Sequence, residues 1–553
     1  MLLPFWDPQI PPVGISCLKS FLQDRGFAVK AADANVRQEF REILDRYFYA
    51  LKEFIPENKR RHLYNIGYDV LRNHLMAHLN YTDDREYGEL IKILIYQTFF
   101  FRDIDDCRVR QLIGIIDDFY TRLKKYIHDL LDRERPAVLG LSVFSGTLAA
   151  SMFAAGLAKE KFPAIKTIMG GGIFSGELDI NTPNFKFFLE KAKNIDRIFV
   201  GEGEVLLLKY LNGELPDSQR VFTKACIGSE VVDLAAVDVP DFSDFECEYY
   251  TKMANYTSRS CPFQCNFCVE TVHWGKFRAK RPGQIVDELI VLYHKYGSQV
   301  FLMCDCLLNP VITGLSREFI KRDTALYWGG YLRVDRHVCS ADHVFLWRQG
   351  GFYRARLGLE SGSQSMLDAM GKQNTIEQMK LSVNMLAKAG IKTTTMWVVG
   401  YPGETEEDFL QTLNFIEEMA DDIYEADCNP FWHFLSGQGN SARWRENSVL
   451  LYPRSAQEML YSQTWELTIP PSRAEKYDRV NRFMAHCQGL GVPNPYSLCD
   501  INSADERWKR LHKNAVPPLL EFKIEDHYID ECKRVNNLQS ARNTRPHSDD
   551  WNF

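Results

Sequence analysis

The spacing of hydrophobic and polar positions predicts an α/β domain in the first part of the chain. Short apolar runs are typical of buried parallel strands, and apolar positions three or four residues apart are typical of helices. We expect extended segments at residues 2–5, 27–32, 138–143, 166–169 and 197–200, with helices at 15–22 and 147–161. Strands that alternate with helices favour a doubly wound parallel sheet, whose ligand lies at the carboxyl ends of the strands.

A different pattern interrupts this domain from about residue 36 to residue 135. Apolar and aromatic side chains fall at helical spacing there, as at Phe40, Ile43 and Tyr47 and again at Leu112, Ile115 and Phe119. We predict a mostly helical insertion whose dense aromatic face is core packed against the neighbouring domain rather than a cofactor site.

The second half of the chain repeats a strand–helix unit. Expected strands lie at 300–304, 327–332, 354–359, 393–399 and 425–431, and helices at 282–295, 373–389 and 404–419. This pattern predicts a partial (β/α)6 barrel. The expected domains are therefore residues 1–235, 249–438 and a C-terminal segment of helix and loop at 439–553. The stretch at 233–248 would be a linker, and the polar tail from about residue 540 would be disordered.

Composition excludes several classes of partner. The net charge of −7 offers no electrostatic footprint for nucleic acid or an anionic membrane. No apolar stretch reaches the roughly 20 residues of a membrane span, and the first residues lack the basic start of a secretory signal. We expect a cytoplasmic protein, in which the 14 cysteines stay reduced rather than form disulfides.

One group of cysteines stands apart from the others. Cys261, Cys265 and Cys268 have CxxxCxxC spacing, so three thiolates from one loop can hold three corners of a [4Fe–4S] cubane. The fourth iron is left for a ligand that is not protein. The alternative is a zinc site, for which His273 is the nearest fourth ligand.

This cysteine motif resembles the signature of the radical S-adenosylmethionine (SAM) superfamily. Further along the chain, Gly358-Leu-Glu-Ser-Gly-Ser363 and Gly400-Tyr-Pro-Gly-Glu-Thr405 resemble two later motifs of that superfamily, in the same order. The resemblance implies these SAM-binding residues: Phe267, Asp305, Arg333, Glu360 and Ser361. Arg333 and Asp305 have a second interpretation, as ion pairs that close the barrel without touching SAM.

The resemblance also implies the chemistry. SAM binds the open iron, a one-electron reductant such as flavodoxin or ferredoxin supplies the electron, and the resulting 5′-deoxyadenosyl radical removes a hydrogen atom from a small-molecule or peptide substrate. The cofactors perform the difficult step, and the barrel orients them and excludes water.

The first domain resembles the cobalamin-binding domain found in one branch of the superfamily. The residues implied to line the cobalamin are Ser142, Ser145, Gly170, Gly171, Gly172, Glu202 and Gly203. Two features depart from the branch: Ile173 and Phe174 replace its usual histidine, and the helical insertion is long. A domain that keeps the fold without cobalamin is thus an alternative.

Bound cobalamin, expected between the edge of the first sheet and the mouth of the barrel, would imply methyl transfer. The substrate would be an unactivated carbon, or a phosphorus, of a natural product or ribosomal peptide. The alternatives without net methylation are cyclisation, rearrangement, and epimerisation with a thiol as hydrogen donor. The candidate donors are Cys306, Cys339 and Cys428. A non-catalytic cobalamin or SAM sensor is a further alternative, which the intact cysteine motif disfavours.

Overall fold

The computed structural model describes residues 1–6, 9–228, 231–435, 442–452, 465–495 and 498–512. The chain forms two compact units. The first unit contains residues 1–246, 262–276 and 432–469, and the second contains residues 247–261, 277–431 and 470–553. Both units thus draw on segments that are far apart in the sequence, which no linear division of the chain predicts. The predicted domain boundaries stay a prediction.

The first unit is built on a parallel sheet with the order β1-β2-β3-β4. The strands are β1 (Val138–Ser142), β2 (Lys166–Gly170), β3 (Arg197–Val200) and β4 (Val221–Thr223). Beyond β1 lies the N-terminus, because the amino group of Met1 donates to the Gly140 carbonyl at 2.8 Å and the Ser142 amide donates to the Met1 carbonyl at 2.9 Å. Leu2 in turn pairs in parallel with Asp33. The order of the extended segments therefore runs from Asp33 to Leu2 to β1 and reverses between Leu2 and β1, which confirms the doubly wound topology.

One expected strand is much shorter than the sequence suggested. Residues 27–32 were expected to form a strand, whereas only the single bridge between Leu2 and Asp33 is regular. The reason is its position at the sheet edge, where one side of the backbone has no neighbouring strand. Instead, the Ala31 amide donates to the Asp244 carboxylate at 2.7 Å.

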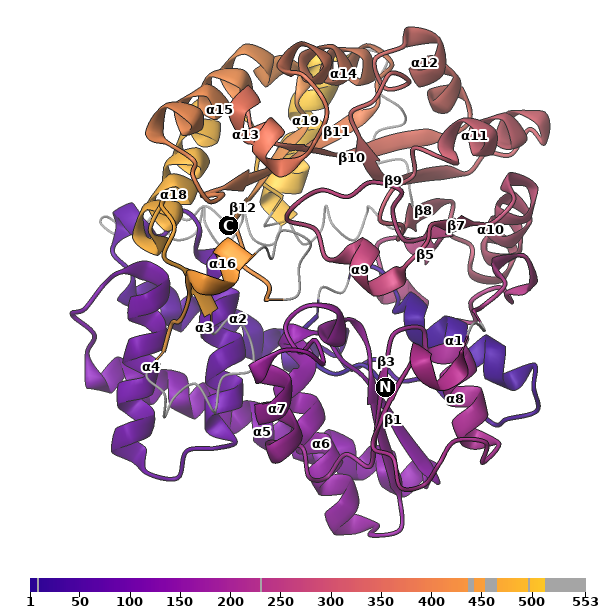
Figure 1. The fold of residues 1–553 in the computed structure, drawn as a ribbon, viewed down its shortest axis with the longest axis vertical. Coiled ribbons are helices and arrows are strands. Elements are labelled where there is room, and N and C mark those ends of the chain that lie inside the picture. The colour runs from indigo at the N-terminus through magenta and orange to yellow at the C-terminus, as the bar shows by residue number, and fades with distance from the viewer. Residues whose placement is uncertain (7–8, 229–230, 436–441, 453–464, 496–497, 513–553) are drawn as a thin grey trace, which may run out of the picture. The chain divides into compact units, whose positions relative to one another are not determined.

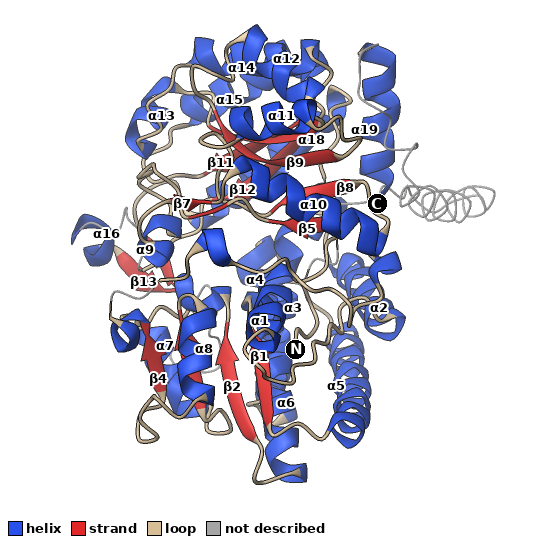
Figure 2. Cartoon of the chain, turned by 90° about the vertical axis from the view of Figure 1, so that its right-hand side faces the viewer, coloured by secondary structure: helices blue, strands red, loops and turns tan. Residues whose placement is uncertain are grey.

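Helices cover both faces of this sheet (Figure 2). They are α1 (Val13–Gln23), α6 (Leu148–Lys161), α7 (Pro183–Lys191) and α8 (Gly203–Leu211). Helices α1 and α8 pack on each other, and α6 packs against β1. Both ends of the predicted 147–161 helix are confirmed to within one residue.

The predicted helical insertion is confirmed and lies between the Asp33 bridge and β1. It consists of α2 (Gln38–Phe54), α3 (Leu63–His78), α4 (Asp84–Phe99) and the long α5 (Asp106–Glu134). A short 3₁₀ turn (Glu57–Lys59) lies between α2 and α3. Phe40, Tyr47 and Phe119 are fully buried. The Phe119 ring lies 5.8 Å from Phe40 within the insertion and 5.2 Å from Phe5 outside it, so the aromatic positions pack both within the insertion and against the rest of the first unit.

The second unit is a six-stranded parallel sheet with the order β12-β11-β10-β9-β8-β5 (Figure 1, magenta to orange). Its strands are β5 (Met253–Asn255), β8 (Val300–Met303), β9 (Tyr327–Arg333), β10 (Phe352–Glu360), β11 (Lys392–Val399) and β12 (Glu425–Pro430). Its helices are α10 (Pro282–Tyr296), α11 (Ile312–Lys321), α12 (Ala341–Gln349), α13 (Gln364–Met370), α14 (Ile376–Lys388) and α15 (Glu406–Met419). Six strands in chain order confirm the predicted partial barrel.

The two faces of the second sheet differ in their surroundings. Trp328 of β9 packs against Phe319 of α11, and Trp397 of β11 packs against Phe415 of α15. These residues define the helix-covered face. On β10, Leu357 pairs in register with Thr395, which is two residues from Trp397, so Leu357 also lies on the helix-covered face. Side chains alternate along a strand, so Arg356 and Arg354 lie on the opposite face, which we call the inner face.

The segment after β12 is more varied than predicted. Helices α18 (Arg473–Gly489) and α19 (Leu498–Leu511) belong to the second unit, and the short α16 (Ala442–Glu446) belongs to the first. We expected only helix and loop, but β13 (Ser448–Leu450) and β14 (Trp465–Leu467) pair in antiparallel register. The reason is backbone hydrogen bonding between segments too short to show a period in the sequence. The predicted tail from residue 540 lies outside the described residues. Within the described part, no helix is both long and apolar enough to span a membrane.

Candidate functional site

The cysteine loop connects two short antiparallel strands. Strand β6 (Ser258–Arg259) pairs antiparallel with β7 (Arg278–Ala279), and Ser260 turns the chain with a φ of +73°. Cys261, Cys265 and Cys268 follow, and the Cys268 amide donates to the Cys265 carbonyl at 3.1 Å. The loop ends in the short helix α9 (Glu270–Trp274), which packs against the 3₁₀ turn at Gly172–Ser175 of the first unit.

The chemistry of the three cysteines fits an iron–sulfur cluster. Each of the three is partly exposed, whereas Cys17, Cys428 and Cys487 are buried. Three thiols on one loop leave one iron of a cubane for another ligand. Among the described residues, no three His, Cys, Asp or Glu side chains are already drawn together in a metal-ligating arrangement. The side chain of His273, the zinc alternative, lies outside the described part.

Asp305, predicted to contact SAM, is a buried side chain that connects two strand ends. Its carboxylate accepts hydrogen bonds from the amide and hydroxyl of Thr257 and from the Ser258 hydroxyl, at 2.6–2.9 Å. Burial raises the pKa of Asp305. These contacts hold the end of β8 against the start of β6, immediately before the cysteine loop. These partners are amide and hydroxyl donors rather than the cation that the ion-pair alternative expected, and contact between Asp305 and SAM stays a prediction.

Arg333 closes β9, and its backbone is fixed by a residue that the sequence analysis did not single out. The Arg333 amide donates to Asn309 Oδ1 at 2.9 Å, and Asn309 Nδ2 donates to the Arg333 carbonyl at 2.8 Å. Asn309 Nδ2 also donates to Asp335 at 2.8 Å. The only signal in the sequence was that Asn309 follows the loop after a predicted strand.

Glu360 stands at the carboxyl end of β10 in an unusual conformation. Its φ is +66°, and the register of β10 against β11 shifts between Gly358 and Glu360. The side chain turns back over Gly358, because a Cβ on Gly358 would lie 2.7 Å from Glu360 Oε1. Lys372 Nζ lies 2.9 Å from the same oxygen. Glu360 therefore has a cationic partner within the protein, which the sequence analysis missed.

Ser361, the other predicted SAM residue of this motif, is fully buried. Its hydroxyl lies 3.4 Å from Thr412 Oγ1 of α15 and accepts from the Ser363 amide at 3.2 Å. The remaining member of the set, Phe267, is partly exposed in the cysteine loop.

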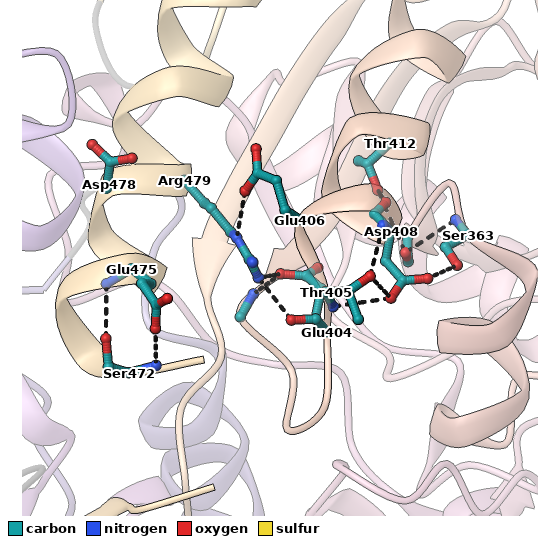
Figure 3. Close-up of polar contacts among 12 residues, drawn as sticks. Ser363, Glu404, Thr405, Glu406, Asp408, Thr412, Ser472, Glu475, Asp478 and Arg479 are labelled. Carbon is teal, nitrogen blue, oxygen red and sulfur yellow. Dashed lines mark hydrogen bonds and ion pairs between the residues drawn. The ribbon is translucent and has the colours of Figure 1, made fainter. Parts of the chain in front are cut away.

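The turn between β11 and α15 is held by the C-terminal helix α18 (Figure 3). Glu404 Oε2 accepts from the Gly400 amide and from Arg479 Nη1, both at 2.7 Å. Burial raises the pKa of Glu404 to about 7, although Arg479 opposes this shift. Thr405 and Asp408 form a capping box that starts α15, and Asp408 also accepts from the Ser363 hydroxyl at 2.5 Å.

The three candidate hydrogen donors lie in different surroundings. Cys428 pairs in register with Trp397, so it lies on the helix-covered face, and burial raises its pKa. Cys339 Sγ lies 3.3 Å from the Ser382 hydroxyl of α14. Cys306 follows β8 and is partly exposed. Cys428 and Cys339 are thus packed against helices, which leaves Cys306 as the better placed of the three candidates.

The predicted cobalamin residues all lie at the carboxyl edge of the first sheet. Ser142, Ser145, Gly170–Gly172, Glu202 and Gly203 are partly exposed there, so they fit the lining of a ligand at that edge. Contacts within the edge also require the glycines. A Cβ on Gly171 would lie 2.5 Å from the backbone of Val143, and one on Gly172 would lie 2.9 Å from the Phe144 ring. The Trp6 ring stacks on the Phe144 ring with 4.0 Å between their centroids. The sequence pattern did not predict this contact.

Comparison with known proteins gives a family match for the middle of the chain. Residues 255–416 match the Radical SAM superfamily. The chain is 28% identical over 320 residues to the anaerobic magnesium-protoporphyrin IX monomethyl ester cyclase of Rubrivivax gelatinosus, covering 52% of this chain and 55% of that enzyme. It is 44% identical over 199 residues to the threonylcarbamoyladenosine tRNA methylthiotransferase MtaB of Bacillus subtilis, covering 33% and 42%. The chain spans about half the length of the curated relatives it matches.

One solved structure matches nearly the whole chain. TsrM from Kitasatospora setae, a radical SAM methyltransferase solved with cobalamin and a [4Fe–4S] cluster, superposes with a TM-score of 0.60 at 14% identity, covering 97% of this chain and 99% of TsrM. At that identity the likeness establishes the fold alone. The protein therefore contains a radical SAM domain, which implies SAM and a [4Fe–4S] cluster as cofactors, within a chain that has the fold of TsrM.

Proposed function

We propose that this chain is a cobalamin-dependent radical SAM methyltransferase that methylates an unactivated carbon, or a phosphorus, of a natural product or ribosomal peptide. The observation that carries the proposal is the joint presence of the CxxxCxxC loop in a radical SAM domain and a fold shared along the whole chain with a cobalamin-containing methyltransferase. The doubly wound first sheet supports it, since such a sheet takes its ligand at the carboxyl edge.

In this proposal Cys261, Cys265 and Cys268 hold the cluster. The bound cofactors would supply one-electron cleavage of SAM and a transferable methyl group. Asp305 holds the strand ends on which the cysteine loop begins, and Asn309 fixes the end of β9, where Arg333 would meet the SAM carboxylate as a planar fork. Glu360 would bind the SAM ammonium group in place of Lys372. The partners of the reaction would be a small-molecule or peptide substrate and a one-electron reductant.

Radical chemistry without net methylation is the second candidate. The similarity to a cyclase over about half of the chain favours it, and the partly exposed Cys306 offers a thiol that could return a hydrogen atom to the substrate.

The decisive experiment follows the methyl group of SAM. The reconstituted, cobalamin-loaded protein is reduced with methyl-labelled SAM in the presence of a metabolite extract from its source. We expect 5′-deoxyadenosine and a product that carries the label. Deoxyadenosine with an unlabelled new product would replace methyl transfer by the second candidate. Absence of deoxyadenosine from a cluster-replete protein would overturn both.

A further inference from the structure

Two arginines of β10 lie on the inner face of the second sheet and differ in their polar contacts. Arg354 and Arg356 are two residues apart, so their side chains point to the same side. The Arg354 guanidinium is paired with the Glu425 carboxylate, and its Nη2 donates to Thr394 Oγ1 at 3.1 Å. Because Arg354 and Glu425 are buried and compensate each other, Arg354 has a complete structural role.

Arg356 has no such compensation. Its guanidinium carbon lies 5.6 Å from the centroid of the Tyr331 ring, which is the neighbouring residue on β9. In the described ranges, Arg356 forms neither an ion pair nor a side-chain hydrogen bond, although it is only partly exposed. A guanidinium has five N–H donors, so Arg356 keeps hydrogen-bonding capacity that a ligand can use.

On the carboxyl side of Arg356, the Glu360–Lys372 ion pair lies over Gly358, because a Cβ on Gly358 would be 2.7 Å from Glu360 Oε1 and 3.4 Å from Lys372 Nζ. Gly358 is the next residue of β10 on the inner face and has no side chain. The carboxylate beyond it, Glu360, is 2.9 Å from Lys372. On β12, Asp427 Oδ1 accepts from Asn429 Nδ2 at 3.2 Å. The acidic side chains nearest in the strand register are therefore engaged with other groups.

We propose that Arg356 binds a carboxylate group of the substrate, with the Tyr331 ring beside it. The planar guanidinium fork matches a carboxylate with two parallel hydrogen bonds, and the adjacent aromatic ring suits an apolar part of the same molecule. The substrate is then a carboxylic acid with an aromatic or aliphatic body. This inference rests on the proposed radical SAM function, and SAM itself is the other source of a carboxylate.

The test uses phenylglyoxal, which modifies accessible guanidinium groups, with the modified sites identified by mass spectrometry. The cluster-reconstituted protein is labelled alone, with SAM, and with SAM plus benzoate or the neutral benzamide. We expect Arg356 to react with and without SAM, benzoate to slow its labelling about ten-fold at saturation, and benzamide to have no effect. Arg354, in its buried pair, should stay unlabelled throughout.

Three outcomes overturn the proposal. The first is that Arg356 is not labelled under any condition. The second is that SAM alone protects Arg356, which would assign the carboxylate to SAM. The third is that benzoate and benzamide have equal effects on the labelling. Deoxyadenosine formation in the same preparation reports on the proposed function separately. Stability provides a second measurement: Arg356→Gln should keep or raise the melting temperature, whereas Arg354→Gln should lower it because it leaves Glu425 buried without its cation.

Discussion

At the scale of single residues, side chains that look equivalent in the sequence have different surroundings. Asp305 and Glu360 are both carboxylates at strand ends of one sheet. Asp305 is buried and accepts from hydroxyl and amide donors, whereas Glu360 has one ion pair and is partly exposed. A carboxylate with remaining acceptor capacity can bind a ligand, so Glu360 is the stronger candidate for SAM.

The cysteine loop gives the first prediction. Alanine at Cys261, Cys265 or Cys268 should abolish the cluster and deoxyadenosine formation, because two thiolates do not hold a cubane. The measurement is iron and sulfide content after anaerobic reconstitution. Cys107→Ala is the matched control, since Cys107 is exposed on α5 of the helical insertion, and it should retain full iron. A cysteine variant of the loop with normal iron and turnover would refute the assignment.

Glu360 gives the second prediction. Glu360→Gln should leave the iron content unchanged and weaken SAM binding by about 2–5 kcal/mol, the cost of removing one partner of a buried charged contact. Equilibrium dialysis with labelled SAM measures this loss. Lys372→Gln is the control, because it removes the internal partner and spares the carboxylate. If both variants bind SAM as the wild type does, Glu360 only pairs with Lys372.

At the scale of elements, the C-terminal helix α18 is an integral part of the second unit. Arg479 bonds to Glu404 at the turn before α15, and the Lys476 ammonium lies 3.4 Å from the Phe431 carbonyl after β12. Phe483 packs near Trp397 on the helix-covered face. These contacts fasten the helix to the ends of β11 and β12.

The third prediction tests this attachment with two glycines of the same turn. Gly400 and Gly403 both have positive φ, so alanine strains either position by about 1–2 kcal/mol. A Cβ on Gly400 would lie 1.9 Å from Cγ of Lys476, whereas one on Gly403 meets nothing within 4 Å. Gly400→Ala should therefore lose roughly 1–3 kcal/mol more than Gly403→Ala. Urea unfolding compares the two, and equal midpoints would contradict the packing of Lys476 in this turn.

At the scale of the whole molecule, the proposed cobalamin site at the carboxyl edge of the first sheet can be tested by substitution. Gly171→Val would be a poor test, because the added side chain would collide with the Val143 backbone whether or not a corrin binds. Ser145 is a better position, since it lies at the carboxyl edge and is partly exposed.

The fourth prediction follows from this position. Protein from cobalamin-fed cells should contain one cobalamin, and Ser145→Trp should lose it while keeping its iron. Lys166→Trp, at the exposed amino end of β2, is the control and should keep both. The visible spectrum reports the corrin, and iron is measured separately. A cluster-replete wild type that takes up no cobalamin, even after refolding with hydroxocobalamin, would leave the second candidate function as the better interpretation.

The sequence by itself determined the elements and the chemistry of the cysteine loop. Strands β1, β2 and β3 and those from β8 to β12 were predicted to within about two residues, because buried strands and amphipathic helices have periods that are local properties of the chain. The three cysteines were predicted as a group because their spacing is also local.

Tertiary structure decided what each polar side chain contacts. No sequence motif links Lys372 to Glu360 or Asn309 to Arg333. Likewise, no spacing rule connects Arg479 with Glu404. The contrast between Arg354 and Arg356 likewise depends on Glu425, which β12 brings to the first arginine and not to the second. Such pairings depend on strand order and register, and these are fixed only when the whole sheet assembles.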